Sequence, residues 1–238
     1  MRINVLDHGF IKLVDSMPAI NPEYQHPEWG DGDERIVAAA RVSTGGEVKG
    51  REQNQKLLRY LWANKHTSPF EQVRFTFHAK MPIFVARQWI RHRTGSFNEK
   101  SARYAEMKDE FYVPTLERMR RQSAFNKQGS GEQLDLETAE QSIAAIRRVS
   151  ETAYGVYQEL LQTGLARELA RMVLPVNFYT EWYWTTDLHN LFHFLKLRLD
   201  SHAQHEIQVY GYAILDLIQP LCPASVELFK DSIAECAS

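Results

Sequence analysis

The sequence has few cysteines, no long apolar run and almost no net charge. Its two cysteines, Cys222 and Cys236, are too few for a disulfide framework and fit a reducing cytoplasm. No apolar run reaches the roughly 18 residues of a membrane helix, and the opening MRINVLDHGF lacks the apolar core of a signal peptide. A net charge of −2 argues against a chain-wide attraction to nucleic acid or to an anionic membrane. We therefore expect a cytoplasmic protein with no nucleic-acid or membrane partner, in which any anion site depends on local clustering of charge.

The bulk composition is that of an ordinary globular protein. The 238 residues suit one large domain or two small ones, and the 44% hydrophobic content is enough to build a sizeable core. We find no internal repeat and no low-complexity segment. The architecture therefore has to be read from local patterns.

Hydrophobic and polar residues alternate over 73–81 and 176–184, and this period of two predicts two strands. Shorter strands are expected near 3–6 and 10–14, and residues 96–109 are expected to form a loop or a short helix. Helical spacing with Pro or Gly stops predicts helices at 36–43, 51–65, 82–93, 135–162, 166–173, 187–198, 203–219 and 223–234. Surface loops are expected at 17–33 and 123–133. Because no regular β-α-β order is present, we predict an α+β fold with a central, mostly antiparallel sheet flanked by helices, a long helix and a C-terminal helical part.

A basic cluster lies between residues 87 and 103. It contains one acid, Glu99, and the basic side chains Arg87, Arg91, His92, Arg93, Lys100 and Arg103. Arg87 and Arg91 would share one face of a helix, and guanidinium groups bind phosphate oxygens through paired donors. An alternative stays open, since cations also stabilise the last turn of any helix. The cluster indicates either an anion site or a solvated helix end.

The cluster also resembles a known family. The segment RQWIRHRTGSFNEKSARY, residues 87–104, is similar throughout to the signature of flavin-dependent thymidylate synthases. Three further segments resemble that family in the same order: HTSPFE at 66–71, ARMVLP at 170–175 and LRLDSHAQ at 197–204. The resemblance covers about residues 1–225 and implies a single domain over 1–238.

The resemblance implies an activity and a set of partners. The expected enzyme methylates dUMP to dTMP with 5,10-methylenetetrahydrofolate as carbon donor. FAD would carry the hydride and NADPH would reduce the flavin. The resemblance also implies a homotetramer whose active sites are shared between subunits.

Site residues follow from the same resemblance. It implies FAD contacts at Ser68, Arg91, His92, Arg93, Glu99, Asp187, Leu188, His189 and His193. It implies dUMP contacts at Gln88, Trp89, Ile90, Arg91, Glu99, Lys100, Ser101, Ala102, Arg103, Arg171 and Arg198. Asp187 and His193 depart from the family, which often has Asn there, and Ser68 replaces a Thr while keeping the hydroxyl.

By the same resemblance, Arg198 is the expected catalytic residue. A cation beside the uracil ring stabilises negative charge at N3 or O4 and raises electron density at C5. No thiol nucleophile is expected, because neither cysteine lies in a cluster of basic residues. Ser101 could attack as a nucleophile, since His92 and Glu99 are near in the sequence, but no base with an orienting partner is recognisable. We favour a hydrogen bond from Ser101 to the nucleotide.

Two histidine pairs, His189 with His193 and His202 with His205, have spacings that could hold zinc on a helix face. Neither pair has a defined fourth ligand, so we expect no metal. Two other functions stay open on the residues alone, a regulatory nucleotide-binding module and a nucleic-acid-binding protein. A second arginine set at Arg171 and Arg198 favours an enzyme over the first, and the net charge argues against the second.

Overall fold

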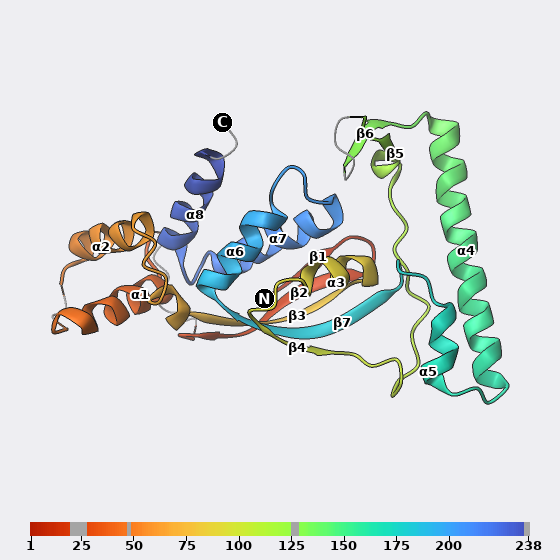
Figure 1. Ribbon diagram of the computed structural model, residues 1–238, viewed down its shortest axis with the longest axis horizontal. Coiled ribbons are helices and arrows are strands. Elements are labelled where there is room, and N and C mark those ends of the chain that lie inside the picture. Colours follow the sequence, from red (N-terminus) through yellow and green to blue (C-terminus); the bar gives the residue numbers. More distant parts are fainter. Residues whose placement is uncertain (20–27, 47–48, 125–128, 236–238) are drawn as a thin grey trace.

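A five-stranded antiparallel sheet lies at the centre of the computed structural model, which describes residues 1–19, 28–46, 49–124 and 129–235 (Figure 1). The strand order is β1-β2-β3-β7-β4. The strands are β1 Arg2–Val5, β2 Gly9–Met17, β3 Arg74–Pro82, β4 Ser96–Glu99 and β7 Tyr179–Asp187. The predicted α+β fold is confirmed.

The two central strands, β3 and β7, are the ones with the clearest alternation in the sequence. Phe75, Phe77 and Ala79 of β3 are buried on the same face as Trp182 and Trp184 of β7. β7 begins at Tyr179 rather than at residue 176, because the preceding residues form a turn in which the Phe178 N–H donates to the Pro175 carbonyl. The alternation of hydrophobic residues therefore predicted both strands, but it placed the start of β7 three residues too early.

The expected loop or short helix at 96–109 is wrong at its start, because residues 96–99 form strand β4 on β7. Only Phe97 in this short strand faces the core, where its ring lies 5.0 Å from the Trp182 ring. The other strand residues are exposed and polar. A single inward residue is too little for an alternating pattern to be recognised.

Helices cover one face of the sheet and both of its ends (Figure 1). Their bounds are α1 Asp31–Arg41, α2 Arg51–Ala63, α3 Ile83–Trp89, α4 Leu136–Gln162, α5 Arg167–Ala170, α6 Leu188–Arg198, α7 His205–Ile218 and α8 Pro223–Glu235. Helices α3, α6 and α7 pack on the sheet, α1 and α2 contact α8 at one end, and α4 with α5 stands at the other. The expected long helix is α4, whose N-cap Asp135 accepts a hydrogen bond from the Thr138 N–H at 2.9 Å.

Helix α3 ends at Trp89, four residues before the predicted end at residue 93. The chain must turn there to enter β4, and Gly95 lies so close to β7 that a Cβ would be 2.9 Å from the Thr185 carbonyl oxygen. Arg91 and Arg93 therefore lie in the turn after the helix. The expectation that Arg87 and Arg91 share a helix face is wrong for this reason.

Short elements complete the described chain. These are the hairpin strands β5 Arg120–Gln122 and β6 Ser130–Gln133, and 3-10 turns at Val42–Thr44, Phe70–Gln72, Leu116–Arg118 and Arg171–Val173. The last of them replaces the second half of the helix expected at 166–173. Residues 20–27 and 125–128 of the expected loops, and Cys236, lie outside the described residues. Within the described ranges, no helix is long and apolar enough to cross a membrane.

A buried carboxylate joins the first helix to the last. Asp33 accepts hydrogen bonds from the N–H of Gly30, beside the start of α1, and from the N–H groups of Ala224 and Ser225 at the start of α8. The Ser225 hydroxyl donates a further bond of 2.6 Å. Burial raises the pKa of Asp33 to about 6, although these hydrogen bonds act to lower it.

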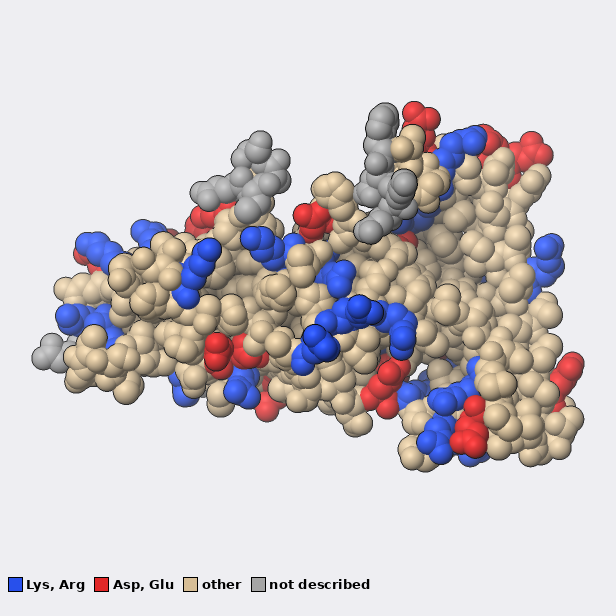
Figure 2. All heavy atoms as spheres, in the orientation of Figure 1, with Lys and Arg blue, Asp and Glu red and all other residues tan. Residues whose placement is uncertain are grey.

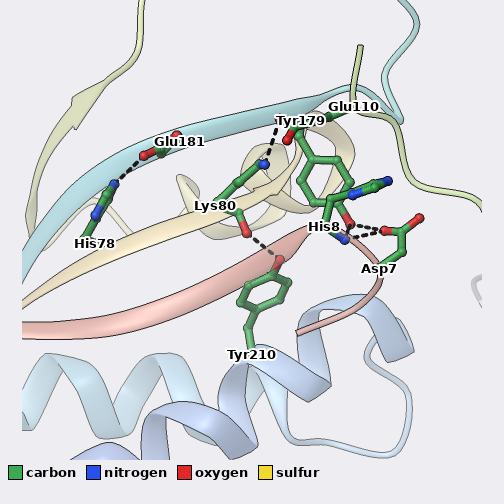
Figure 3. A network of polar contacts seen from close by, with 8 residues as sticks. All are labelled: Asp7, His8, His78, Lys80, Glu110, Tyr179, Glu181 and Tyr210. Atoms are coloured by element: carbon green, nitrogen blue, oxygen red, sulfur yellow. Dashed lines mark hydrogen bonds and ion pairs between the residues drawn. The ribbon is translucent and has the colours of Figure 1, made fainter. Parts of the chain in front are cut away.

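Polar contacts bind the sheet to α7 and to the segment after β4 (Figure 3). The Tyr210 hydroxyl of α7 donates to the Lys80 carbonyl at 2.6 Å, and a Cβ at position 9 would clash with that hydroxyl, so Gly9 allows the approach. The Lys80 Nζ lies 2.7 Å from Glu110 Oε2. The Tyr179 hydroxyl donates to Asp7 at the turn between β1 and β2.

Candidate active site

The most ordered group of predicted site residues lies where α3 and α6 end. Arg198, the last residue of α6, is partly buried and donates from Nε to His92 Nε2 at 3.1 Å. A terminal guanidinium nitrogen, Nη2, donates to the Gln88 carbonyl oxygen at 2.9 Å. The Gln88 side chain in turn donates to Gln204, the residue before α7. The segment 88–92, at the end of α3 and just beyond it, therefore orients the guanidinium at the end of α6.

The electrostatics of this corner favour an uncharged His92. Burial lowers the pKa of His92 to about 4, and Arg198 and His193 contribute to that lowering. Its ring lies edge-on to Phe194, with centroids 4.9 Å apart. Burial also lowers the pKa of Arg198. A neutral imidazole can accept the Arg198 hydrogen bond, whereas an imidazolium cannot.

Some predicted contacts cannot be made by their side chains. Trp89 is fully buried, with its ring stacked on Phe194 at 5.0 Å, so its side chain faces the core rather than a nucleotide. Leu188 is fully buried as well. Asp187 caps α6, where it accepts from the Asn190 N–H at 2.9 Å and from the Asn190 amide at 2.7 Å. The negative charge at this departure from the family pattern is thus offset by a helix N-terminus.

A second group lies around a cavity of about 350 Å³. Its walls include the predicted nucleotide residues Glu99, Lys100, Ser101, Ala102 and Arg171. The hydroxyl of Thr180, another wall residue, donates to Glu99. In the described part of the chain, the hydrogen bond to Ser101 Oγ comes from the Arg103 N–H at 3.2 Å, and no histidine or carboxylate bonds to it. This geometry favours Ser101 as a hydrogen-bonding group over Ser101 as a nucleophile.

The walls of this cavity include none of the residues bonded around Arg198. Ile83 of α3 lines the cavity beside Ser101, but neither Gln88 nor Arg198 does. Arg103 is instead paired with Glu168 at 3.1 Å on the exposed surface. The structure therefore places the predicted nucleotide contacts in two separate sets.

Three of the predicted flavin residues, Ser68, His189 and His193, border two further cavities. Ser68 lines a cleft of about 620 Å³ together with Arg41, Ser43 and Lys49. His189 and His193 line a pocket of about 450 Å³ with Lys196. Leu61 and His66 contribute to both, so the cavities are neighbours.

Arg41 and Ser43 were not identified from the sequence as residues that line the cleft beside Ser68. Arg41 Nη2 donates to Asn54 at 2.6 Å, whereas its Nε is buried with no hydrogen-bond partner among the described residues. The signal was the run Arg41-Val42-Ser43-Thr44, which combines a cation with two hydroxyls at the end of a helix. Figure 2 shows further Lys and Arg side chains gathered in an arc over the middle of the molecule, where Figure 1 draws α3.

The histidine pairs show no metal geometry. Within the ranges that the structure describes, no group of three or more His, Cys, Asp or Glu side chains could hold a metal ion. His202 is paired with Asp200 at 2.8 Å in an exposed loop.

Comparison with known proteins gives consistent matches. A family model described as "Thymidylate synthase complementing protein" matches residues 27–224. The chain is 50% identical over 230 residues to a flavin-dependent thymidylate synthase of Dictyostelium discoideum, covering 97% of this chain and 74% of that protein. It is 50% identical over 239 residues to a flavin-dependent thymidylate synthase of Thermus thermophilus, covering 100% and 81%. Among solved structures, it resembles the UMP/dUMP methylase PolB from Streptomyces cacaoi bound with 5-Br dUMP, with a TM-score of 0.81, 35% identity, and coverage of 96% and 97%.

Proposed function

Because the chain belongs to the flavin-dependent thymidylate synthases, we propose that it makes dTMP from dUMP with 5,10-methylenetetrahydrofolate as carbon donor, FAD as hydride carrier and NADPH as reductant. As a member of that family it is a flavin-dependent methyltransferase. We assign this activity to residues 1–238 as one catalytic domain. The observation that carries the assignment is the guanidinium of Arg198, held by His92 and the Gln88 carbonyl between predicted flavin and nucleotide residues.

Arg198 is the group we assign to uracil activation. Its remaining N–H groups would donate to N3 or O4 of the ring and stabilise the negative charge that the ring carries there before C5 attacks the one-carbon unit. A thiol mechanism has no support from Cys222, which is fully buried and whose pKa is raised by that burial. In this proposal the ring is activated by a cation and hydrogen bonds rather than by a covalent bond to Cys222.

The residues present fit a flavin dinucleotide. A pyrophosphate requires cations and hydroxyl donors, and the cleft beside Ser68 offers Lys49, Ser43 and the buried Arg41 Nε, which no other described residue bonds. Arg91 and Arg93, which the resemblance also assigns to FAD, are exposed in the turn after α3. Bound FAD would supply the hydride that reduces the transferred one-carbon unit to a methyl group.

We assign the nucleotide phosphate to the second set, where Ser101 and Arg171 line the cavity and offer a hydroxyl and a cation. Arg103, which is paired with Glu168 on the exposed surface, would add a second cation on exchanging that partner for the phosphate. Arg198 lies outside that cavity in the same chain. A homotetramer in which one subunit supplies Arg198 and another supplies Arg171 would complete the site. This arrangement supports active sites shared between subunits.

The activity is tested with purified protein reconstituted with FAD. We expect a yellow protein whose flavin spectrum changes on addition of dUMP. We also expect dTMP to form only when NADPH, methylenetetrahydrofolate and FAD are all present. A colourless protein that takes up no added FAD would contradict the proposal.

The shared site is tested by mixing subunits. With dUMP kept below the raised KM of Arg171→Ala, Arg198→Ala and Arg171→Ala are each expected to lower activity strongly when alone. Coexpressed, they should recover about one quarter of wild-type activity, because random assortment in a symmetric oligomer pairs two intact contributions in that fraction of sites. No recovery in verified mixed oligomers would show that both arginines act within one chain.

A further inference from the structure

The hydrogen bonds of Arg198 single out His92 for a role other than a cofactor contact. A guanidinium carries five N–H donors. One of them, on Nε, donates to His92 Nε2 at 3.1 Å, and one on Nη2 donates to the Gln88 carbonyl at 2.9 Å. The remaining donors have no partner within the described part of the chain. The bonded edge therefore determines where the free edge points.

His92 is suited to hold that edge because of its own surroundings. To accept at Nε2, the ring must be uncharged and carry its proton on Nδ1. Burial, Arg198 and His193 all lower its pKa, to about 4, so the ring is neutral near pH 7. Contacts with the Phe194 and His193 rings, at centroid distances of 4.9 and 5.8 Å, restrict its rotation.

We propose that His92 is a positioning residue for Arg198: it accepts the Nε–H and thereby turns the free guanidinium donors toward the nucleotide. This inference rests on the proposed function, in which Arg198 activates the uracil. It goes beyond a flavin contact, because the effect of His92 then passes through another side chain. The two roles predict different results when Arg198 is already absent.

The first experiment uses the full-length enzyme reconstituted with FAD and compares three variants per bound flavin. His92→Leu removes the acceptor and should lower kcat by about 100-fold, the typical result of a misplaced catalytic group. His92→Phe keeps a ring against Phe194 but also lacks the acceptor, so it should behave like His92→Leu. His92→Gln places an oxygen near the position of Nε2 and should recover most of the lost kcat.

His78→Leu is the matched control. His78 is a half-buried histidine in β3 that contacts Glu181 on the face of the sheet turned away from the helices (Figure 3). This control should keep the wild-type kcat. If His92→Gln were as impaired as His92→Leu at equal flavin content, the acceptor would not be what matters and the proposal would be overturned.

A double-mutant cycle separates positioning from a direct flavin role. The four proteins are wild type, His92→Leu, Arg198→Ala and the double variant. The readout is dUMP affinity, measured from the change in the flavin spectrum. A positioning residue gives a strongly non-additive cycle, so His92→Leu should change the affinity little once Arg198 is absent. Equal losses in both backgrounds would overturn the proposal.

The cycle also distinguishes the two levels of the argument. Full dTMP formation by Arg198→Ala would contradict the assignment of uracil activation to Arg198, on which this inference rests. Loss of activity in Arg198→Ala, together with additive effects of His92→Leu, would leave the proposed function standing and remove only the positioning role.

Discussion

The two sets of predicted nucleotide residues differ in how their side chains are held. Arg198 is partly buried and is fixed by hydrogen bonds to His92 and Gln88, at the end of α3 and just beyond it. Arg103 has side-chain exposure of 55%, and its partner Glu168 has 51%. An exposed ion pair of this kind contributes on the order of 0–1 kcal/mol to the free energy of unfolding. Removing the hydrogen-bond partner of a partly buried group costs more, because that group is left without a partner and with little access to water.

This difference indicates that the two sets have different roles, one in catalysis and one in binding the nucleotide. A group that must be placed correctly before the reaction benefits from fixed partners, because catalysis depends on preorganised donors. A group that captures a phosphate can stay mobile and exchange a weak internal partner for the ligand. We therefore expect substitutions of Arg198 and its hydrogen-bond partners to change kcat as well as dUMP affinity, and substitutions around Ser101 to change mainly KM for dUMP.

The largest effect should come from Arg198→Ala. Removing one preorganised donor costs about 10²–10³ in kcat, and loss of the whole guanidinium should reduce dTMP formation below detection while FAD stays bound. The measurement is turnover per bound flavin. Arg87→Ala, which removes an exposed arginine of α3, is the control and should retain turnover. Loss of FAD from Arg198→Ala would instead indicate a cofactor role.

A smaller effect on a different constant is expected for Arg171→Ala. A hydrogen bond to a charged group contributes about 1.5–3 kcal/mol, so KM for dUMP should rise roughly 10- to 150-fold with a smaller change in kcat. Arg167→Ala removes a nearby exposed arginine that is paired with Glu106 and should leave KM unchanged. If Arg171→Ala lowered kcat at unchanged KM, the proposed division between the two sets would be wrong.

Ser101→Ala should be milder. A neutral hydrogen bond contributes about 0.5–1.5 kcal/mol, so activity should fall by roughly 10-fold or less. Steady-state kinetics and a dUMP titration test this. A complete loss of turnover with intact dUMP affinity would revive Ser101 as a nucleophile and give the exposed set a share of the chemistry.

The smallest effect concerns stability and pH. The pKa of His92 falls from an ordinary value of 6.5 to about 4 on folding. Between these values the unfolded chain binds a proton that the folded chain does not, so stability decreases as the pH falls through this window. Asp33 has the opposite effect on the pH dependence of stability, because its pKa is raised on folding. A substitution of His92 leaves this contribution of Asp33 in place.

His92→Gln should therefore lose less stability than the wild type as the pH falls from about 6.5 to about 4, the window that the two pKa values of His92 define. Denaturant unfolding at the two pH values gives the difference. Identical losses in the two proteins would show that His92 is not kept uncharged by its surroundings.

The sequence predicted those elements whose pattern is local. Strands β3 and β7 alternate over many residues, and α4 carries its own cap at Asp135. Strand β4 was missed because its stability depends on pairing with residues 182–185, far along the chain. The early end of α3 was missed for the same reason, since the turn at Gly95 is imposed by contact with β7.

The site shows the same limit. By resemblance, Gln88, Ser101 and Arg198 form one set of nucleotide contacts. Whether their side chains lie together depends on the surface at which each segment emerges from the core, and the sequence does not give that surface. Trp89 illustrates this, since it lies between two predicted site residues in the sequence and yet is fully buried against Phe194. Successive residues of a helix point in different directions, so neighbours in the sequence need not face the same site.

The hydrogen bonds of the Asp33 carboxylate bear on when each part of the chain can fold during synthesis. Its donors at Ala224 and Ser225 follow it by 191 and 192 positions. A ribosome delivers the N-terminal residues first, so α1 and α2 emerge long before the groups that complete their attachment. These helices can take their final place only when the end of α7 and the start of α8 have left the exit tunnel. The cleft beside Ser68, which α1 and α2 border, can therefore be complete only after the start of α8 has been synthesised, although its own residues are translated early.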